Sequence, residues 1–160
     1  MMNPFEKLIK PEKHAEKIEI KKIVAAPKLH KPGVEKYKEQ ILAGKTIKPI
    51  VVLKHPHEEL YAVLDGHHRF YAFLELGAQT IDAAVMKSNK FLFNKTKDGW
   101  LQPTTAMTKY IRVPTIVFAK YINNFVRNPK HLKFPKERLE RFKSKISSLK
   151  SKKILKLKKN

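Results

Sequence analysis

The sequence predicts an α/β chain of the α+β kind, in which helices pack on a small mixed sheet. The residues from Tyr61 to Leu64 form a short apolar run typical of a strand, and apolar residues then recur at helical spacing over 70–77. The run from Ile50 to Leu53 is apolar without interruption, which indicates a strand buried on both faces. The order strand, helix, strand, strand, helix, strand predicts helices packed on one sheet.

An arm, a strand and a helix are expected before the strand of 50–53. Residues 1–16 show no clear period and are expected to form an N-terminal arm. Isoleucines then alternate with charged residues over 18–24, which predicts one half-buried strand. A loop bracketed by Pro27 and Pro32 leads to a helix expected from Val34 to Ala43, and Gly44 is expected to end it.

The remaining elements follow the helix of 70–77. Residues 80–87 predict another strand, and a hairpin turn is expected at 97–99, just before Trp100. A helix is predicted over 114–127, with these residues facing inward: Ile116, Val117, Tyr121, Ile122 and Phe125. A second helix is predicted over 135–149, with Leu139, Phe142, Ile146 and Leu149 on one side. The predicted organisation is therefore an arm (1–16), a core (17–90), a helical extension packed on or beside it (91–150) and a flexible basic tail (151–160).

Length, composition and charge indicate the number of domains, the cellular location and the charge of a ligand. The 160 residues suffice for one domain with a substantial core. No apolar run approaches the roughly 20 residues of a membrane span, and the absence of cysteine is typical of a reducing compartment, so a cytoplasmic location is expected. The net charge is +21, of which residues 91–160 carry +16. Such a charge concentrates polyanions around the C-terminal half.

The strongest functional signal is the corner Asp65-Gly66-His67-His68-Arg69 between the strand and the helix. Backbone N–H groups at the start of a helix lack internal partners and attract anions, phosphate above all. Gly66 allows close approach, Arg69 offers paired donors, and the histidines can donate hydrogen bonds or carry protons. Asp65 can hold Mg²⁺ or accept a proton. The alternative is structural: Asp65 as a helix N-cap, Arg69 on a solvated face and His68 hydrogen-bonded within the fold.

Other candidates lie in loops or at strand ends. Lys48 precedes a strand and can reach a phosphate, or it is a solvated lysine. Trp100 is a candidate for stacking on a base, although an aromatic residue after a turn is usually core or lid. His55 and His57 have no further ligands at a fixed spacing, so a solvated loop is expected there rather than a metal site.

The corner motif and its flanks resemble the ParB/sulfiredoxin superfamily over about residues 18–86. The corner itself is most similar to that of archaeal free serine kinases. The resemblance implies a ParB/sulfiredoxin-like fold that binds a nucleotide (ATP, ADP or CTP), with Gly66, His67, His68, Arg69 and Lys48 as the binding residues. The cysteine of sulfiredoxins is replaced by His67, which excludes their chemistry. The kinases carry a glutamate base where this chain has His30, with Glu35 as the second candidate.

The basic C-terminal end has three interpretations. It can neutralise nucleic-acid phosphates, lie on an anionic membrane or bind an acidic partner. Nucleic acid is favoured over a membrane because the apolar stripe is narrow. The candidate contacts are Lys136, Arg138, Arg141, Lys143, Lys145, Lys150, Lys152 and Lys153.

Two functions follow. The first is a ParB-like nucleotide-binding protein that also associates with nucleic acid, with a homodimer as one possible assembly. The second is a kinase of a small hydroxyl substrate, with Asp65, His68 and His30 or Glu35 at the transferred phosphoryl group and Mg²⁺ at Asp65.

Overall fold

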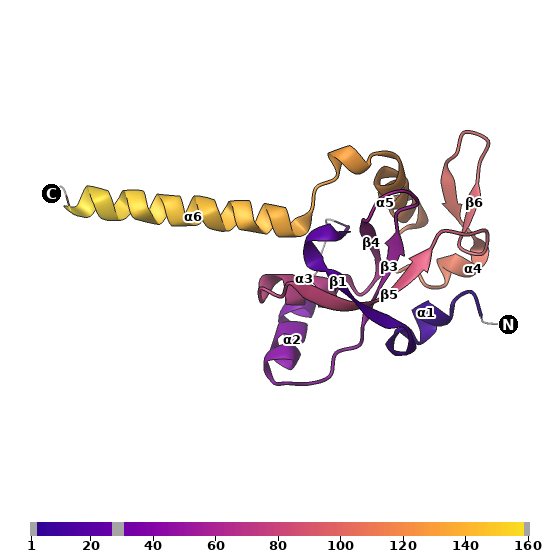
Figure 1. Ribbon diagram of the computed structural model, residues 1–160, viewed down its shortest axis with the longest axis horizontal. Coiled ribbons are helices and arrows are strands. Elements are labelled where there is room, and N and C mark those ends of the chain that lie inside the picture. The colour runs from indigo at the N-terminus through magenta and orange to yellow at the C-terminus, as the bar shows by residue number, and fades with distance from the viewer. Residues whose placement is uncertain (1–2, 27–30, 159–160) are drawn as a thin grey trace.

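The structure is a computed structural model that describes residues 3–26 and 31–158. Five strands form its main sheet, in the order β1 (Ala15–Glu19), β5 (Thr80–Lys87), β3 (Ile50–Lys54), β4 (Tyr61–Asp65) and β2 (Ile23–Val24). The β3–β5 and β2–β4 pairs are parallel, whereas β1–β5 and β3–β4 are antiparallel. The predicted small mixed sheet is thus confirmed (Figure 1).

The prediction of one strand over 18–24 is wrong. A 3₁₀ turn, Ile20–Lys22, separates β1 from β2, and the two strands lie at opposite edges of the sheet. Ile20 and Ile23 are both fully buried. They are three residues apart, a spacing that a 3₁₀ turn keeps on one side and a strand does not. The sheet curls because ten consecutive residues reach both of its edges.

Helices cover the sheet on both faces. On one face α3 (His67–Glu75) packs Phe70 and Leu74 against Ile50, Val52 and Val63. On the other face α5 (Thr115–Arg127) packs Phe118, Ile122 and Phe125 against the alternate residues of the same strands. The helix α2 (Lys31–Leu42) packs on α3 and ends near Gly44, which has φ +75° as expected of a helix terminus.

The expected N-terminal arm is folded against the core. It contains α1 (Glu6–Ile9) and a 3₁₀ turn, Pro11–Lys13. Leu8 is buried in the same core cluster as Phe118, and Lys7 Nζ donates a 2.7 Å hydrogen bond to the carbonyl oxygen of Val85. The arm thereby covers part of β5.

The inward face predicted for the helix of 114–127 is partly wrong. Ile116 and Val117 are 57% and 49% exposed, and the buried stripe instead includes the polar Asn123. The strands β6 (Phe93–Lys95) and β7 (Leu101–Pro103) form a hairpin beside this helix. The Asn123 amide bonds to the backbone of this hairpin: Oδ1 accepts from Leu101 N–H at 2.8 Å, and Nδ2 donates to Leu101 O at 2.9 Å. Hydrophobic periodicity alone does not include an amide in a buried stripe. The turn predicted at 97–99 does join these two strands.

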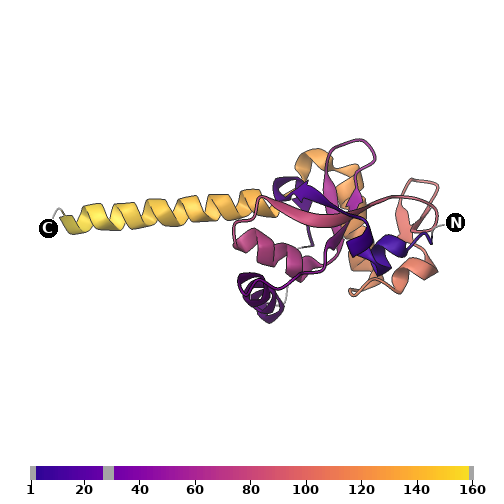
Figure 2. The same cartoon turned by 60° about the horizontal axis from the view of Figure 1, so that its bottom comes forward.

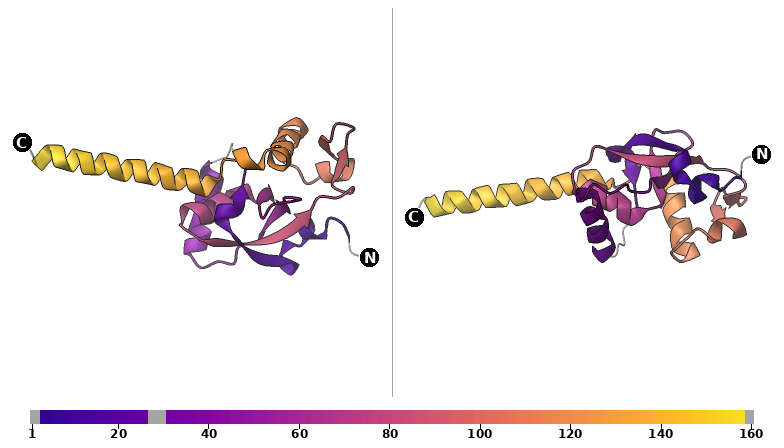
Figure 3. Two further views of the ribbon diagram at one scale, coloured as in Figure 1. Left: turned by 45° about the horizontal axis from the view of Figure 1, so that its top comes forward. Right: turned by 90° about the horizontal axis from the view of Figure 1, so that it is seen from below.

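The last elements lead away from the body. A short α4 (Thr105–Thr108) precedes α5, and a 3₁₀ turn, Pro129–His131, follows it. The final helix, α6 (Pro135–Lys158), continues past Leu149, where it was expected to end, into the segment predicted as a flexible tail. Figures 1, 2 and 3 show that α6 projects from the body as a single rod in every view. Within 3–26 and 31–158, no helix has the length and apolar character needed to span a bilayer.

Candidate functional site

The corner between β4 and α3 is shaped by Gly66. This residue is the N-cap of α3 and has φ +97°, so the predicted alternative of Asp65 as the N-cap is wrong. A Cβ at Gly66 would lie 2.8 Å from both Arg69 Nη2 and Ile50 Cγ2. Phe70 N–H bonds to Gly66 O, which leaves the N–H groups of residues 67–69 without partners inside the helix. The corner therefore presents the anion-attracting helix start that the sequence predicts.

Arg69 is held by the backbone beneath this corner. Its side chain is buried, and Nη1 donates 2.8 Å hydrogen bonds to the carbonyl oxygens of both Lys48 and Pro49. Nη2 lies 3.3 Å from Asp65 Oδ2. The alternative of a solvated Arg69 is wrong. The guanidinium fixes the start of β3 beside the start of α3, and its positive charge stays at the site.

His67 is a buried, neutral imidazole. Its Nε2 accepts a 3.1 Å hydrogen bond from Ala26 N–H, at the end of the β2 segment. Burial lowers the pKa of His67 to about 4, against a smaller opposing effect of Asp65 and with a small further lowering from His68. At neutral pH the ring carries no charge, and it joins the corner to β2.

His68 lies next to the start of α2. A Cβ at Gly33 would come within 3.0 Å of the His68 ring, so the glycine allows α2 to approach this histidine. Among the described residues, no side-chain hydrogen bond involves His68, whose ring can both donate and accept hydrogen bonds.

These residues line a cavity of about 470 Å³. It brings together Lys48 and all five corner residues. Its other wall comes from residues that the sequence analysis did not assign to the site: Tyr37, Tyr110, Arg112 and Tyr121, with Ile111, Val113, Val117 and Phe118. Arg112 is exposed and lies in the loop between α4 and α5. The only signal for it in the sequence is a tyrosine and an arginine flanking Ile111, in a segment of no predicted structure.

Several predicted candidates do not meet at this cavity. Glu35 is exposed on α2, 3.2 Å from Lys38 Nζ, and does not line the cavity. His30 lies outside the described residues. Asp65 is the one carboxylate in the cavity lining, and no group of three metal-ligating residues occurs in the part of the chain that the structure describes.

The remaining candidates have structural partners. His55 is buried, contrary to the expected solvated loop: Nε2 lies 3.0 Å from Val126 O, and Nδ1 accepts from the N–H groups of His57 and Glu58. Its ring thus holds the turn between β3 and β4. Trp100 lies on the hairpin, with Arg127 Cζ 5.6 Å from its ring centroid, and does not line the cavity.

The predicted nucleic-acid contacts lie on α6. Lys136 Nζ donates to Gln79 Oε1 at 2.6 Å, and Arg141 bonds to Glu137 within the helix. Lys143 and Lys145 are exposed, without a carboxylate at ion-pair distance among the described residues. The side chains of Lys150, Lys152 and Lys153 lie outside the described part of the chain.

Comparisons with known proteins place the fold. The model of the ParB N-terminal domain matches residues 7–92. The solved structures that resemble the chain include a free serine kinase in complex with AMP, at 27% identity and a TM-score of 0.43 over 46% of this chain and 31% of that one. They also include C-terminally truncated ParB from Caulobacter crescentus complexed with CTP-gamma-S, at 18% identity and 0.42 over 48% and 46%. Sulfiredoxin from Arabidopsis thaliana matches at 22% identity and 0.42 over 48% and 88%.

No curated protein matches the chain. The chain spans about a third of the length of the free serine kinase that it resembles. The family model covers more than half of the chain and includes the corner, Lys48 and the whole main sheet. The chain therefore belongs to the ParB N-terminal domain family.

Proposed function

We propose that the chain binds a nucleotide in the corner cavity. The observation that carries the proposal is the meeting of free helix-start amides, three cationic side chains and aromatic rings around one cavity of about 470 Å³. A volume of this order is usual for small-molecule sites, which combine apolar walls with a few convergent polar groups. Membership of the ParB family supports a nucleotide as the ligand.

The lining of the cavity combines two kinds of chemistry, cationic groups and aromatic rings. The amides of residues 67–69, with Lys48 and Arg112, would hold the phosphates, since charged donors bind phosphoryl oxygens strongly. Tyr37 and Tyr110 would contact the base. Arg69 contributes its charge while its Nη1 stays on the backbone, and neutral His67 adds none.

The site also fits a magnesium ion that arrives with the nucleotide. Mg²⁺ is usually held by one or two carboxylates together with phosphate oxygens and water. Asp65 is the carboxylate available for this, and its bond to Arg69 is long enough, at 3.3 Å, to compete weakly. We expect Mg²⁺ to increase the affinity for a triphosphate.

A kinase activity is the second candidate. The five-residue corner favours it, with His68 free to meet an acceptor hydroxyl. Glu35, the second base candidate, lies on the exposed side of α2 and pairs with Lys38, which weighs against it as the base. Conversion of serine or a similar hydroxyl compound in the presence of ATP or ADP and Mg²⁺ is the direct assay, and Asp65→Asn should abolish it while Glu35→Gln should not.

Titration calorimetry with ATP, ADP and CTP, each with and without Mg²⁺, tests nucleotide binding. Arg112→Gln should weaken binding about tenfold, the effect expected for one lost charge-assisted contact. Lys109→Gln is the matched control, because it removes one positive charge from the same exposed loop without changing the cavity lining. An equal loss in both variants would indicate long-range attraction only. No binding of any nucleotide by the folded chain would contradict the proposal.

Nucleic-acid association through the basic C-terminal half stays a prediction. The cations of α6 would attract any polyanion at low salt. Their arrangement beside exposed apolar side chains favours an amphipathic ligand over a purely ionic one.

A further inference from the structure

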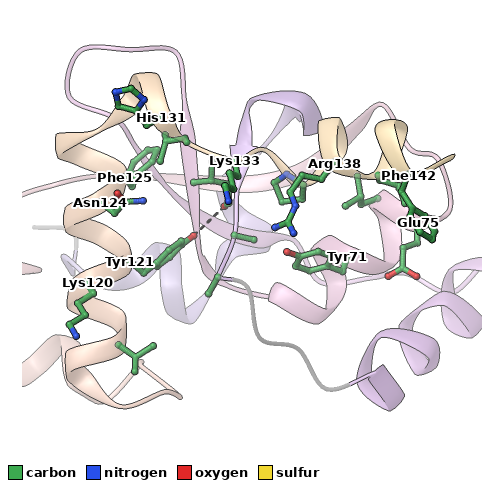
Figure 4. A pocket seen from close by; sticks show the side chains of 18 residues that line it. Tyr71, Glu75, Lys120, Tyr121, Asn124, Phe125, His131, Lys133, Arg138 and Phe142 are labelled. Atoms are coloured by element: carbon green, nitrogen blue, oxygen red, sulfur yellow. Dashed lines mark hydrogen bonds between the residues drawn. The ribbon is translucent and has the colours of Figure 1, made fainter. Parts of the chain in front are cut away.

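A second, larger cavity of about 900 Å³ lies between α3, α5 and the start of α6. Figure 4 looks into it, with Tyr121 and Phe125 of α5 on one side and Tyr71 of α3 and Phe142 of α6 on the other. Most of its lining is apolar. Lys120, Lys133 and Arg138 stand around it, whereas Glu75 is the one carboxylate in its lining. The cavity is therefore an apolar hollow with a positive surround.

The apolar lining continues onto the projecting part of α6. Leu139 and Phe142 line the cavity, and Ile146 and Leu149 follow them along the helix. The last three side chains are 60%, 37% and 64% exposed. The spacings of three, four and three residues are those of the two core positions of a heptad repeat, so these four residues form one seam about 15 Å long.

The charges of α6 follow the same register. Among the described side chains, the positions that flank the seam from Leu139 to Leu149 are all basic: Arg138, Lys143 and Lys145. The opposite side of the helix carries Ser144, Ser147 and Ser148, and nearer its start Glu137, Glu140 and Arg141, so its described residues have no net positive charge. The cations are thus concentrated beside the apolar seam rather than spread around the helix.

We propose that the seam of α6 and the cavity form one docking surface for an acidic amphipathic helix of a partner protein. Its apolar face would cover the seam and enter the cavity, and its acidic residues would meet the flanking cations. Helices that bind in this way place apolar anchors at positions i, i+3, i+4 and i+7. In coiled coils the flanking charges decide which partner is accepted.

Three other candidate ligands, a second copy of the chain, a nucleic-acid duplex and an anionic bilayer, would match only part of this docking surface. A second copy would place its basic flanks against those of the first, and like charges there repel. A nucleic-acid duplex would neutralise the cations but leave Phe142, Ile146 and Leu149 uncovered by apolar groups. A flat anionic bilayer could cover the projecting seam, yet it could not enter a cavity walled by α3 and α5.

The test uses the full chain and two synthetic peptides of about 21 residues, each with leucine at both core positions of every heptad. One peptide carries glutamate at all flanking positions and the other carries lysine. Fluorescence anisotropy should show the glutamate peptide binding at least about tenfold more tightly than the lysine peptide, with the preference decreasing as salt rises.

Variants in the exposed part of α6 keep the test independent of folding. Phe142→Ser with Ile146→Ser should weaken glutamate-peptide binding about tenfold or more, since central apolar anchors dominate such interfaces. Lys143→Glu with Lys145→Glu should remove most of the preference for the glutamate peptide, because it cancels most of the positive charge beside the seam. Ser144→Glu with Ser148→Glu is the control, because it adds acidic groups on the opposite side and should leave the preference unchanged.

Five results would overturn the proposal. Equal binding of the two peptides, or glutamate-peptide binding unaffected by the loss of Phe142 and Ile146, would remove the seam as the docking surface. Tighter binding of a random duplex DNA, or of phosphatidylglycerol vesicles, that displaces the glutamate peptide would assign the surface to those ligands. A dimer in sedimentation that dissociates on Phe142→Ser would assign it to a second copy.

Discussion

The imidazole of His67 accepts a 3.1 Å hydrogen bond from the backbone N–H of Ala26, 41 residues earlier in the chain. The bond joins the first residue of α3 to the segment that follows β2, at the shared edge of both cavities, since Ala26 lines each of them. It requires a neutral ring with its proton on Nδ1. The position of this segment therefore depends on the protonation of one side chain.

The stability of the fold should depend on pH through His67. Its pKa falls from an ordinary 6.5 to about 4 on folding because the ring is buried. Between these values the unfolded chain binds the proton more readily, so stability is complete above about pH 6.5 and is lost as pH falls towards 4. The loss should amount to roughly 3 kcal/mol. Urea unfolding between pH 4 and 7 measures it.

His67→Gln is the variant that isolates this effect. Its amide oxygen can accept from Ala26 N–H but does not titrate, so the fall in stability below pH 6.5 should be smaller by most of that amount. Identical pH profiles for the two proteins would show that other groups cause the acid sensitivity.

Arg69→Lys should destabilise the fold by about 2 to 3 kcal/mol, because an ammonium group cannot serve both carbonyl oxygens and Asp65 from one position. Chemical denaturation measures the change. Loss of nucleotide binding in this variant has to be corrected for the unfolded fraction. Stability within about 0.5 kcal/mol of the parent would mean that water replaces the guanidinium without cost.

Gly66→Ala should cost more than the same change at Gly44. Both residues have positive φ, at +97° and +75°, so each variant pays about 1 to 2 kcal/mol for the left-handed backbone. Only at Gly66 does the new Cβ also meet Ile50 and Arg69, whereas nothing lies within 4 Å at Gly44. The difference in unfolding free energy between the two variants measures this close packing. Equal costs would show that the corner relaxes freely.

Asn123→Ala should lower stability by about 2 to 3 kcal/mol, since it leaves the half-buried N–H and carbonyl groups of Leu101 without their partner. Asn124→Ala, at the next and exposed position of the same helix, should change stability by less than about 0.5 kcal/mol. Thermal unfolding of the two variants side by side tests the pair. A similar loss at both positions would contradict the assignment of the cost to the Asn123 amide, because alanine has the higher helix propensity and the helix itself would not be weakened.

The sequence alone was sufficient to predict the central strands of the sheet and the corner between β4 and α3. The uninterrupted apolar run at Ile50–Leu53 identifies a strand buried on both faces, and the mainly apolar stretch of 81–86 identifies a second, partly exposed strand. The corner was predictable because a strand pattern changes to a helix pattern across one glycine. Both signals lie within a few neighbouring residues.

What the sequence could not supply depends on residues that are distant in the chain. The separation of β1 from β2 depends on their pairing with β5 and β4, and no local pattern encodes those partners. Arg112 reaches the cavity only because α5 packs across the sheet. The carbonyl partners of Arg69 depend on the backbone path before β3. Hydrophobic periodicity therefore predicted that Arg69 lies at the start of a helix, but not which groups it contacts.

The placement of β1 and β2 has a consequence for the nascent chain. Residues 15–24 leave the ribosome early, but β2 has no neighbour until residues 61–62 have emerged, and β1 has none until residues 80–84 follow. Until then Ile18, Ile20 and Ile23 face water or a chaperone. Because the ribosomal tunnel holds back the newest residues, the sheet closes only when much of the C-terminal half has been translated.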